Sequence, residues 1–127
     1  NTKIKNWESR QDLEGRAQAH APERSYALGF NWTPTSHTYL AIDFTGKSNF
    51  YYSDSHNNKS KSYVLTNLNL GYVKNNWNYE LWARNIFDEY YSVRGFYFGN
   101  EAPNFIDTLY ERHGDPRHIG LTIRYDF

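Results

Sequence analysis

The feature that most constrains this sequence is an alternation of apolar and polar residues with a period of two. Residues 117–127 show it most clearly, because the apolar positions Ile119, Leu121, Ile123, Tyr125 and Phe127 are separated by polar residues or glycine. Successive side chains of a β-strand point to opposite faces of the sheet, so the pattern predicts strands with one apolar and one polar face. Helical periodicity is hard to find, and the chain is therefore expected to be all-β.

Five segments carry the alternation and predict an antiparallel meander of about five long strands. The expected strands are residues 24–32, 37–50, 62–73, 77–87 and 117–127. Tight turns are expected at residues 33–36 and 74–76, and long loops at residues 53–61 and 88–116. Residues 1–22 are polar and are expected to be mostly loop, with part of a sixth strand as an alternative. Short turns would then lie at one end of the sheet and long loops at the other.

Aromatic residues make up 19% of the chain, although all hydrophobic residues together make up only 39%. On the expected strands the rings fall into two groups. The group at the short-turn end is Trp32, Tyr39, Tyr72, Trp77, Tyr79, Tyr125 and Phe127, and the group at the other end is Phe50, Tyr51, Tyr52, Tyr63, Phe87, Tyr90 and Tyr91. Two aromatic belts with aliphatic residues between them are typical of the lipid-facing surface of an outer-membrane barrel.

The strand charges agree with this interpretation, because Asp43, Lys47, Glu80, Arg84 and Arg124 all fall on the polar face. A soluble β-sandwich or barrel alternates in the same way and remains the alternative. No apolar run is long enough for a membrane helix, and no signal-peptide pattern opens the chain. Five strands cannot close a membrane barrel, whose smallest form has about eight. The membrane interpretation therefore predicts that the chain is a fragment.

Two segments resemble a known family. Residues 81–91, with Asn85-Ile86-Phe87-Asp88 followed by Tyr91, are similar to the N-[LI]-F-D-x-x-Y segment of TonB-dependent outer-membrane receptors. Residues 114–127, with a Gly-x-Pro-Arg-x-x-Gly entry and a final Phe, resemble the terminal strand of those receptors. Weaker agreement comes from Tyr63 with residues 67–72, and from residues 20–22 before the first strand.

This resemblance implies that residues 1–127 are the C-terminal part of a 22-stranded transmembrane β-barrel, without its plug domain. It implies a place in the outer membrane of a Gram-negative bacterium and a role in energy-dependent uptake of a scarce nutrient, with a ferric siderophore favoured. The implied partners are membrane lipid, the rest of the barrel and plug, the TonB complex (through the missing plug) and the barrel-assembly machinery. The isolated chain is expected to self-associate through its apolar face and strand edges.

Two sets of residues are candidates for function. A ligand-contacting surface is expected in the loop 88–116, where aromatics and a cation lie between glycines that suggest hinges; its candidates are Arg94, Phe96, Tyr97, Phe98 and Asn100. The last strand resembles the signal that the barrel-assembly machinery binds by strand addition. The residues of that signal are His118, Gly120, Ile123, Tyr125 and Phe127.

Other functions lack support in the sequence. Cysteine is absent, and the 5 histidines show no metal-ligand spacing, so no metal site and no cofactor are predicted. No nucleophile elbow or phosphate-binding glycine loop occurs, and the chain is not expected to be an enzyme. The 14 basic and 14 acidic residues balance, which argues against nucleic-acid binding. The alternative function is a soluble β-sheet domain that binds a lipid or a sugar.

Overall fold

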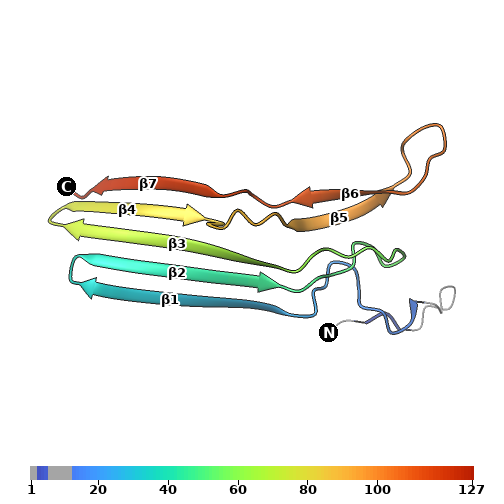
Figure 1. The fold of residues 1–127 in the computed structure, drawn as a ribbon, viewed down its shortest axis with the longest axis horizontal. Coiled ribbons are helices and arrows are strands. Elements are labelled where there is room, and N and C mark those ends of the chain that lie inside the picture. Colours follow the sequence, from blue (N-terminus) through green and yellow to red (C-terminus); the bar gives the residue numbers. More distant parts are fainter. Residues whose placement is uncertain (1–2, 6–12) are drawn as a thin grey trace. The chain divides into compact units, whose positions relative to one another are not determined.

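The computed structural model describes residues 3–5 and 13–127, and the regular elements in these residues are antiparallel β-strands (Figure 1). The strands are β1 (Ser25–Thr35), β2 (Thr38–Lys47), β3 (Tyr63–Lys74), β4 (Trp77–Arg84), β5 (Ser92–Phe98), β6 (Thr108–His113) and β7 (His118–Tyr125). The all-β prediction is confirmed. The five predicted strands correspond to β1, β2, β3, β4 and β7, which form one sheet, and the described residues add a second sheet of two strands that was not predicted.

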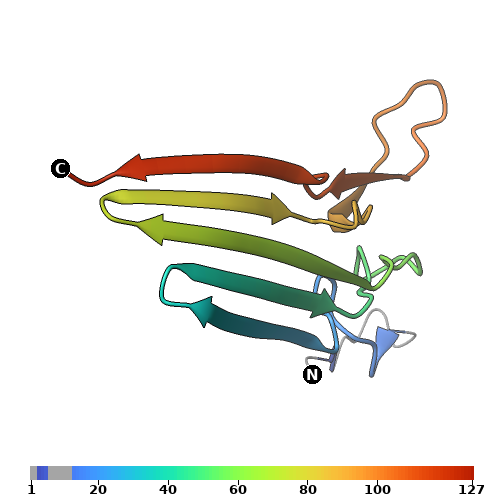
Figure 2. The same cartoon turned by 60° about the vertical axis from the view of Figure 1, so that its left-hand side comes forward.

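Five strands form one sheet in the order β1-β2-β3-β4-β7 (Figure 2). The register aligns Leu70 with Leu81 and Leu81 with Leu121, so alternate residues of the three strands share a face. The expected turn between β3 and β4 is confirmed, and Asn75 lies in it with a φ of 53°. Asparagine tolerates this left-handed conformation better than most residues, which suits it to the turn.

Three strands end at other residues than predicted. Strand β1 continues past Pro34 to Thr35; β1 is an edge strand, where the N–H that proline lacks need not be part of the ladder. Strand β2 ends at Lys47 rather than at residue 50. Beyond it, the Phe50 N–H donates to Ser60 Oγ at 3.0 Å and the Ser60 N–H donates to the Phe50 carbonyl at 2.9 Å.

Strand β4 ends at Arg84, three residues before the predicted end, because Asn85 adopts a φ of 47°. The buried Asn85 side chain then joins two segments. Its Nδ2 donates to the carbonyls of Glu89 at 2.9 Å and Asp115 at 3.1 Å, and its Oδ1 accepts from the Glu89 N–H at 2.8 Å. Asp88 also accepts, through Oδ1, the Arg117 N–H at 2.8 Å. The residues that resemble a family motif thus form a turn that joins the end of β4 to the segment entering β7.

The prediction of a long loop at residues 88–116 is wrong, because these residues contain the hairpin of β5 and β6. The register aligns Arg94 with Arg112, Phe96 with Tyr110 and Phe98 with Thr108, and it is irregular between Ser92 and Arg94. These strands have only 7 and 6 residues, so each offers few periods from which alternation can be recognised.

The two faces of the five-stranded sheet follow the predicted alternation, and rings placed over glycines show this. A Cβ on Gly46 would collide with the Tyr26 ring on the apolar face. On the polar face, a Cβ on Gly71 would collide with the Tyr39 ring, and one on Gly120 with the Trp82 ring. Tyr39 was expected in a lipid-facing belt, and its position over Gly71 corrects that expectation.

The chain divides into two compact units. One comprises residues 1–25, 47–63 and 90–114, and the other comprises residues 26–46, 64–89 and 115–127. The buried apolar residues of the first unit are Leu13, Phe50, Tyr52 and Tyr63. Three of these were expected in the second aromatic belt, and they instead form a small core, whereas Phe87 and Tyr90 are 74% exposed.

In the described part of residues 1–22, pairing is limited to a single bridge between Lys3 and Ala17; residues 6–12 lie outside it. None of the described residues forms a helix long and apolar enough to cross a membrane.

Candidate functional site

Much of the apolar face of the five-stranded sheet is exposed. Large side chains along it are exposed, from 37% for Tyr79 to 64% for Leu28. Asn67, Asn69 and Glu80, on the opposite face, are partly covered. On β2 the apolar-face residues Leu40, Ile42 and Phe44 are half-buried, and on β7 the polar-face residues Thr122 and Arg124 are exposed. The departure from a water-soluble domain, whose apolar side chains are covered, thus lies in the exposed rings and aliphatic side chains of β1, β3, β4 and β7.

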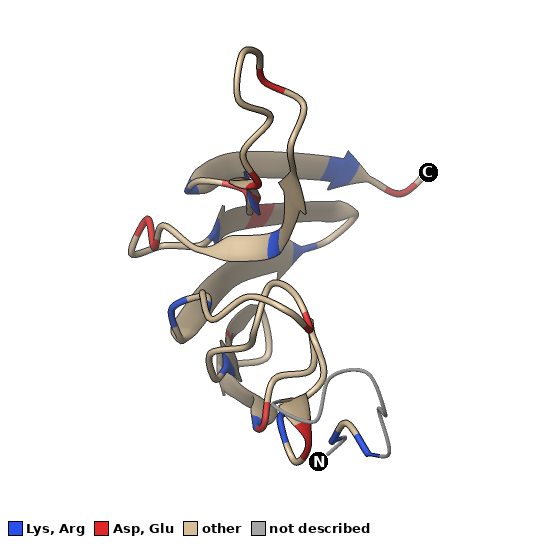
Figure 3. Ribbon diagram, turned by 90° about the vertical axis from the view of Figure 1, so that its right-hand side faces the viewer, with Lys and Arg blue, Asp and Glu red and all other residues tan. Residues whose placement is uncertain are grey.

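The exposed face has an order from end to end. Trp77 and Tyr125 lie opposite each other beside the β3–β4 turn, and their rings are 4.8 Å apart. Tyr72 and Tyr79 form the next cross-strand pair. Farther along the same strands the residues are aliphatic, with Leu70, Leu81, Leu121 and Ile119 all exposed. Few charged residues lie within these strands, and most lie in the loops (Figure 3). A band of aromatic rings beside an aliphatic band suits the interface and hydrocarbon layers of a bilayer.

The β5–β6 hairpin presents a second exposed surface, which carries rings and cations. Phe96 packs edge-on against Phe98 at 5.0 Å and stacks with Tyr110 at 6.1 Å. Arg94 and Arg112 are cross-strand partners on the same face, and both are exposed. Like charges directly opposite each other destabilise a strand pair. This face, termed the arginine–aromatic face, combines two guanidinium groups and three rings, which can bind an anionic, ring-bearing ligand.

The other face of the hairpin packs on the loop after β2. Gly95 is buried there, because the Tyr52 ring occupies the place of a side chain on it. The Tyr52 hydroxyl donates to Glu111 Oε2 at 3.0 Å, and the Ser92 hydroxyl donates to the same oxygen. Gly95 is therefore a packing glycine rather than the hinge that its spacing suggested.

Tyr52 and Tyr97 have perturbed phenol groups on this packed face. Burial raises the pKa of Tyr97, and the negative charge of Glu111 raises it further. Burial is also the main cause that raises the pKa of Tyr52; the hydrogen bond with Ser92 opposes it, and Glu111 adds to it. Both phenols therefore stay neutral to a higher pH than an ordinary tyrosine does.

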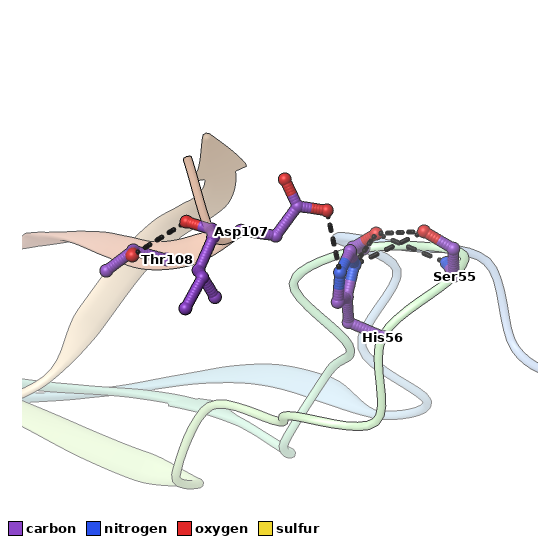
Figure 4. Close-up of polar contacts among 6 residues, drawn as sticks. Ser55, His56, Asp107 and Thr108 are labelled. Atoms are coloured by element: carbon purple, nitrogen blue, oxygen red, sulfur yellow. Dashed lines mark hydrogen bonds and ion pairs between the residues drawn. The ribbon is translucent and has the colours of Figure 1, made fainter. Parts of the chain in front are cut away.

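His56 makes a further contact between this loop and the hairpin. Its ring stacks on Tyr97 with centroids 3.6 Å apart and planes 8° from parallel. Its Nε2 lies 3.6 Å from Asp107 Oδ2, and its Nδ1 lies within hydrogen-bonding distance of the Ser53 and Ser55 hydroxyls (Figure 4). These contacts fix one face of the hairpin to the loop after β2, and the arginine–aromatic face is the opposite face.

The structure brings together three of the five predicted ligand-contacting residues. Arg94, Phe96 and Phe98 share the arginine–aromatic face, Tyr97 lies on the packed face, and Asn100 lies exposed beyond the end of β5. Sequence reasoning missed Arg112 and Tyr110, which belong to β6. The apolar–polar alternation of residues 108–113 could have indicated this strand, but the segment is too short to be recognised as a strand unless its partner strand is known.

The residues of the predicted assembly signal all lie in or just after β7. His118 and Gly120 are on the polar phase, whereas Ile123, Tyr125 and Phe127 are on the apolar phase. Tyr125 lies between two rings, with Trp77 at 4.8 Å and Phe127 at 5.1 Å. The outer edge of β7 has no partner strand among the described residues, so its backbone groups are available for strand addition.

No family model matches the chain, and no solved structure matches it.

Proposed function

We propose that the chain is the C-terminal part of the barrel of a TonB-dependent outer-membrane receptor, and that the intact receptor imports a scarce nutrient such as a ferric siderophore. The observation that carries the proposal is the row of exposed rings and aliphatic side chains on one face of β1, β3, β4 and β7. A bilayer covers such a face along its whole length, with rings at the interface and aliphatic side chains in the hydrocarbon.

The turn formed by residues 85–88 supports the family assignment. In this turn the Asn and Asp of the motif have defined roles, because they join the end of β4 to the segment entering β7 through side-chain hydrogen bonds. These bonds give a physical reason for that residue pattern at that place in a barrel.

The arginine–aromatic face supports the uptake part of the proposal. It lies on the hairpin that follows β4 and precedes β7 in the sequence. Ferric siderophores are often anionic and ring-bearing, and a surface with two opposed arginines and three rings is chemically suited to them.

Two tryptophans on opposite faces provide the test. Trp77 lies on the apolar phase and Trp82 on the polar phase, because adjacent odd and even positions of β4 point to opposite faces. Single-tryptophan variants that keep one or the other are folded into vesicles that contain brominated lipid. Trp77 fluorescence is expected to be quenched by the lipid, and Trp82 fluorescence is expected to be largely spared.

Light scattering in plain buffer distinguishes the alternative. A soluble lipid- or sugar-binding domain would be a monodisperse monomer in buffer and would cover its apolar face, so the brominated vesicles would not quench Trp77 more than Trp82. That result would exclude the membrane proposal, whereas self-association in buffer and one-sided quenching in vesicles would support it.

A further inference from the structure

A pocket in the first unit lies between the N-terminal segment and the loop after β2. Lys3 pairs with Ala17, and Tyr51 pairs with Lys59, each through an isolated bridge. The His20 N–H donates to the Tyr51 carbonyl at 2.9 Å and so connects the N-terminal segment to the loop after β2. The pocket has a volume of about 300 Å³, which is the lower end of the range for small-molecule sites.

Positive charge gathers around one ring in this pocket. The Arg16 guanidinium carbon lies 4.0 Å from the centroid of the Tyr51 ring, and Lys59 Nζ lies 4.3 Å from the same centroid. Lys3 also lines the pocket. The electron-rich face of the ring favours cations, but two like charges beside one ring repel each other. An anion bound in the pocket would offset that repulsion.

The charges are not neutralised by the residues that hold them. Arg16 donates from Nη1 to Asn57 Oδ1 at 3.1 Å and from Nη2 to the His56 carbonyl, and both acceptors are neutral. Each of these nitrogens carries a second N–H. Among the described residues, the acidic group that lines the pocket is Glu23, against three cations. Among the described lining residues, basic groups therefore outnumber acidic ones by three to one.

We propose that this pocket is a phosphomonoester-binding site, with Arg16 and Lys59 as the principal contacts and Lys3 as a third. A phosphomonoester carries a charge of about −1.5 to −2 at neutral pH, which matches the excess of cations better than the single charge of a carboxylate. The fixed Arg16 fork provides directed donors to phosphate oxygens, and Lys59 provides a mobile point charge. The site is separate from the arginine–aromatic face and does not depend on the proposed uptake function.

The phosphate group could come from a soluble ester or from a lipid headgroup, and two probes separate these sources. The whole chain in nonionic detergent is titrated with glycerol 3-phosphate, with glycerol and succinate as controls. In parallel, the chain is mixed with phosphatidylcholine vesicles with and without phosphatidic acid. Binding is followed by calorimetry and by the NMR signals of the Tyr51 ring.

Arg16→Gln and Lys59→Gln are the test variants, and Lys74→Gln is the matched control because Lys74 lies at the β3–β4 turn, outside the pocket. Each test variant is expected to weaken binding at least about tenfold, and the control to bind like the wild type. Among the described residues, Lys59 makes no side-chain hydrogen bond, whereas Arg16 makes two, so Lys59→Gln tests the site even if Arg16→Gln disturbs its segment.

Saturable binding of glycerol 3-phosphate that both variants lose would support the site with a soluble ligand. Binding confined to phosphatidic acid vesicles, and lost in both variants, would support it with a lipid headgroup. The proposal is overturned if neither probe binds, if succinate binds as tightly as glycerol 3-phosphate, or if both variants keep wild-type affinity.

Discussion

The indole ring of Trp82 on β4 lies directly over Gly120 on β7. The two residues are cross-strand partners, and a Cβ on Gly120 would come within 2.2 Å of Trp82 Cζ2. The indole N–H also donates to Thr122 Oγ1 at 3.2 Å, on the same face of the same strand. The glycine therefore makes room for a ring that covers the polar face of the outer strand pair.

Replacing Gly120 with alanine is expected to displace the Trp82 ring and to reduce the free energy of unfolding by about 1–3 kcal/mol, the usual cost of overpacking. Denaturant unfolding in detergent gives the free energy, and near-ultraviolet circular dichroism follows the indole. Gly29→Ala is the control, because a Cβ there would meet only the Asp43 carboxylate, at 3.3 Å. Equal stability of both variants would show that the ring does not depend on Gly120.

Long alternation made much of this sheet predictable from sequence. Strands β3, β4 and β7 begin within one residue of their expected starts, because 8 to 12 residues provide several periods of the pattern. The ends were less predictable, since side-chain bonds decide them. The end of β4 depends on Asn85, whose partners Glu89 and Asp115 lie 4 and 30 residues away.

Asn85→Ala is expected to lower the free energy of unfolding by about 2–4 kcal/mol, because it removes three hydrogen bonds of a buried side chain. Hydrogen exchange at the Glu89 amide should speed up, since that amide loses its acceptor. Asn75→Ala is a matched control: Asn75 has a similar φ of 53° but lies in an exposed turn without such a network. If the two variants lose equal stability, the cost comes from backbone conformation and not from the network.

The candidate ligand surface was only partly predictable. The composition of the segment predicted Arg94, Phe96 and Phe98 as candidates. It did not predict that they share one face, because the segment was not recognised as a strand. Tyr97 was predicted from the same composition, but its side chain lies on the other face, because neighbouring side chains of a strand point to opposite faces. Arg112 contributes by pairing with Arg94 across 18 positions of sequence, and no local pattern reveals that pairing.

The opposed arginines predict opposite effects on stability and binding. Arg112→Glu replaces a like-charge pair with an attractive one, so it is expected to stabilise the hairpin by about 0.2–1 kcal/mol. The same change should weaken binding of an anionic ferric catecholate complex at least about tenfold, as should Arg94→Gln. Hydrogen exchange in β5 and β6 measures the first effect, and fluorescence titration measures the second. Undiminished binding by both variants would remove this face from the ligand site.

The raised pKa values of Tyr52 and Tyr97 are expected to depend on the carboxylate of Glu111. Because the pKa values of Tyr52 and Tyr97 are raised in the fold, their neutral forms stabilise it at pH values below the ordinary tyrosine pKa of 10.0, and that stability is lost as the pH rises through the raised values. Glu111→Gln keeps an oxygen acceptor but removes the charge, so both pKa values should fall. Ring-carbon NMR of labelled tyrosine measures them. Glu89→Gln is the control and should leave both unchanged.

The rings at the end of β7 allow the proposed assembly signal to be separated from ordinary membrane anchoring. If Tyr125 and Phe127 bind the assembly machinery, changing both to serine should leave the proposed receptor unassembled and degraded in the periplasm, because strand addition requires side chains that fit specific pockets. Changing Tyr72 and Tyr79 to serine removes two rings from the same face of the sheet but spares β7. That control should cost some stability and still reach the outer membrane. Surface labelling and heat-modifiable gel mobility measure the assembled receptor. Equal surface levels for the two double variants would show that these rings anchor the barrel in the membrane but are not part of an assembly signal.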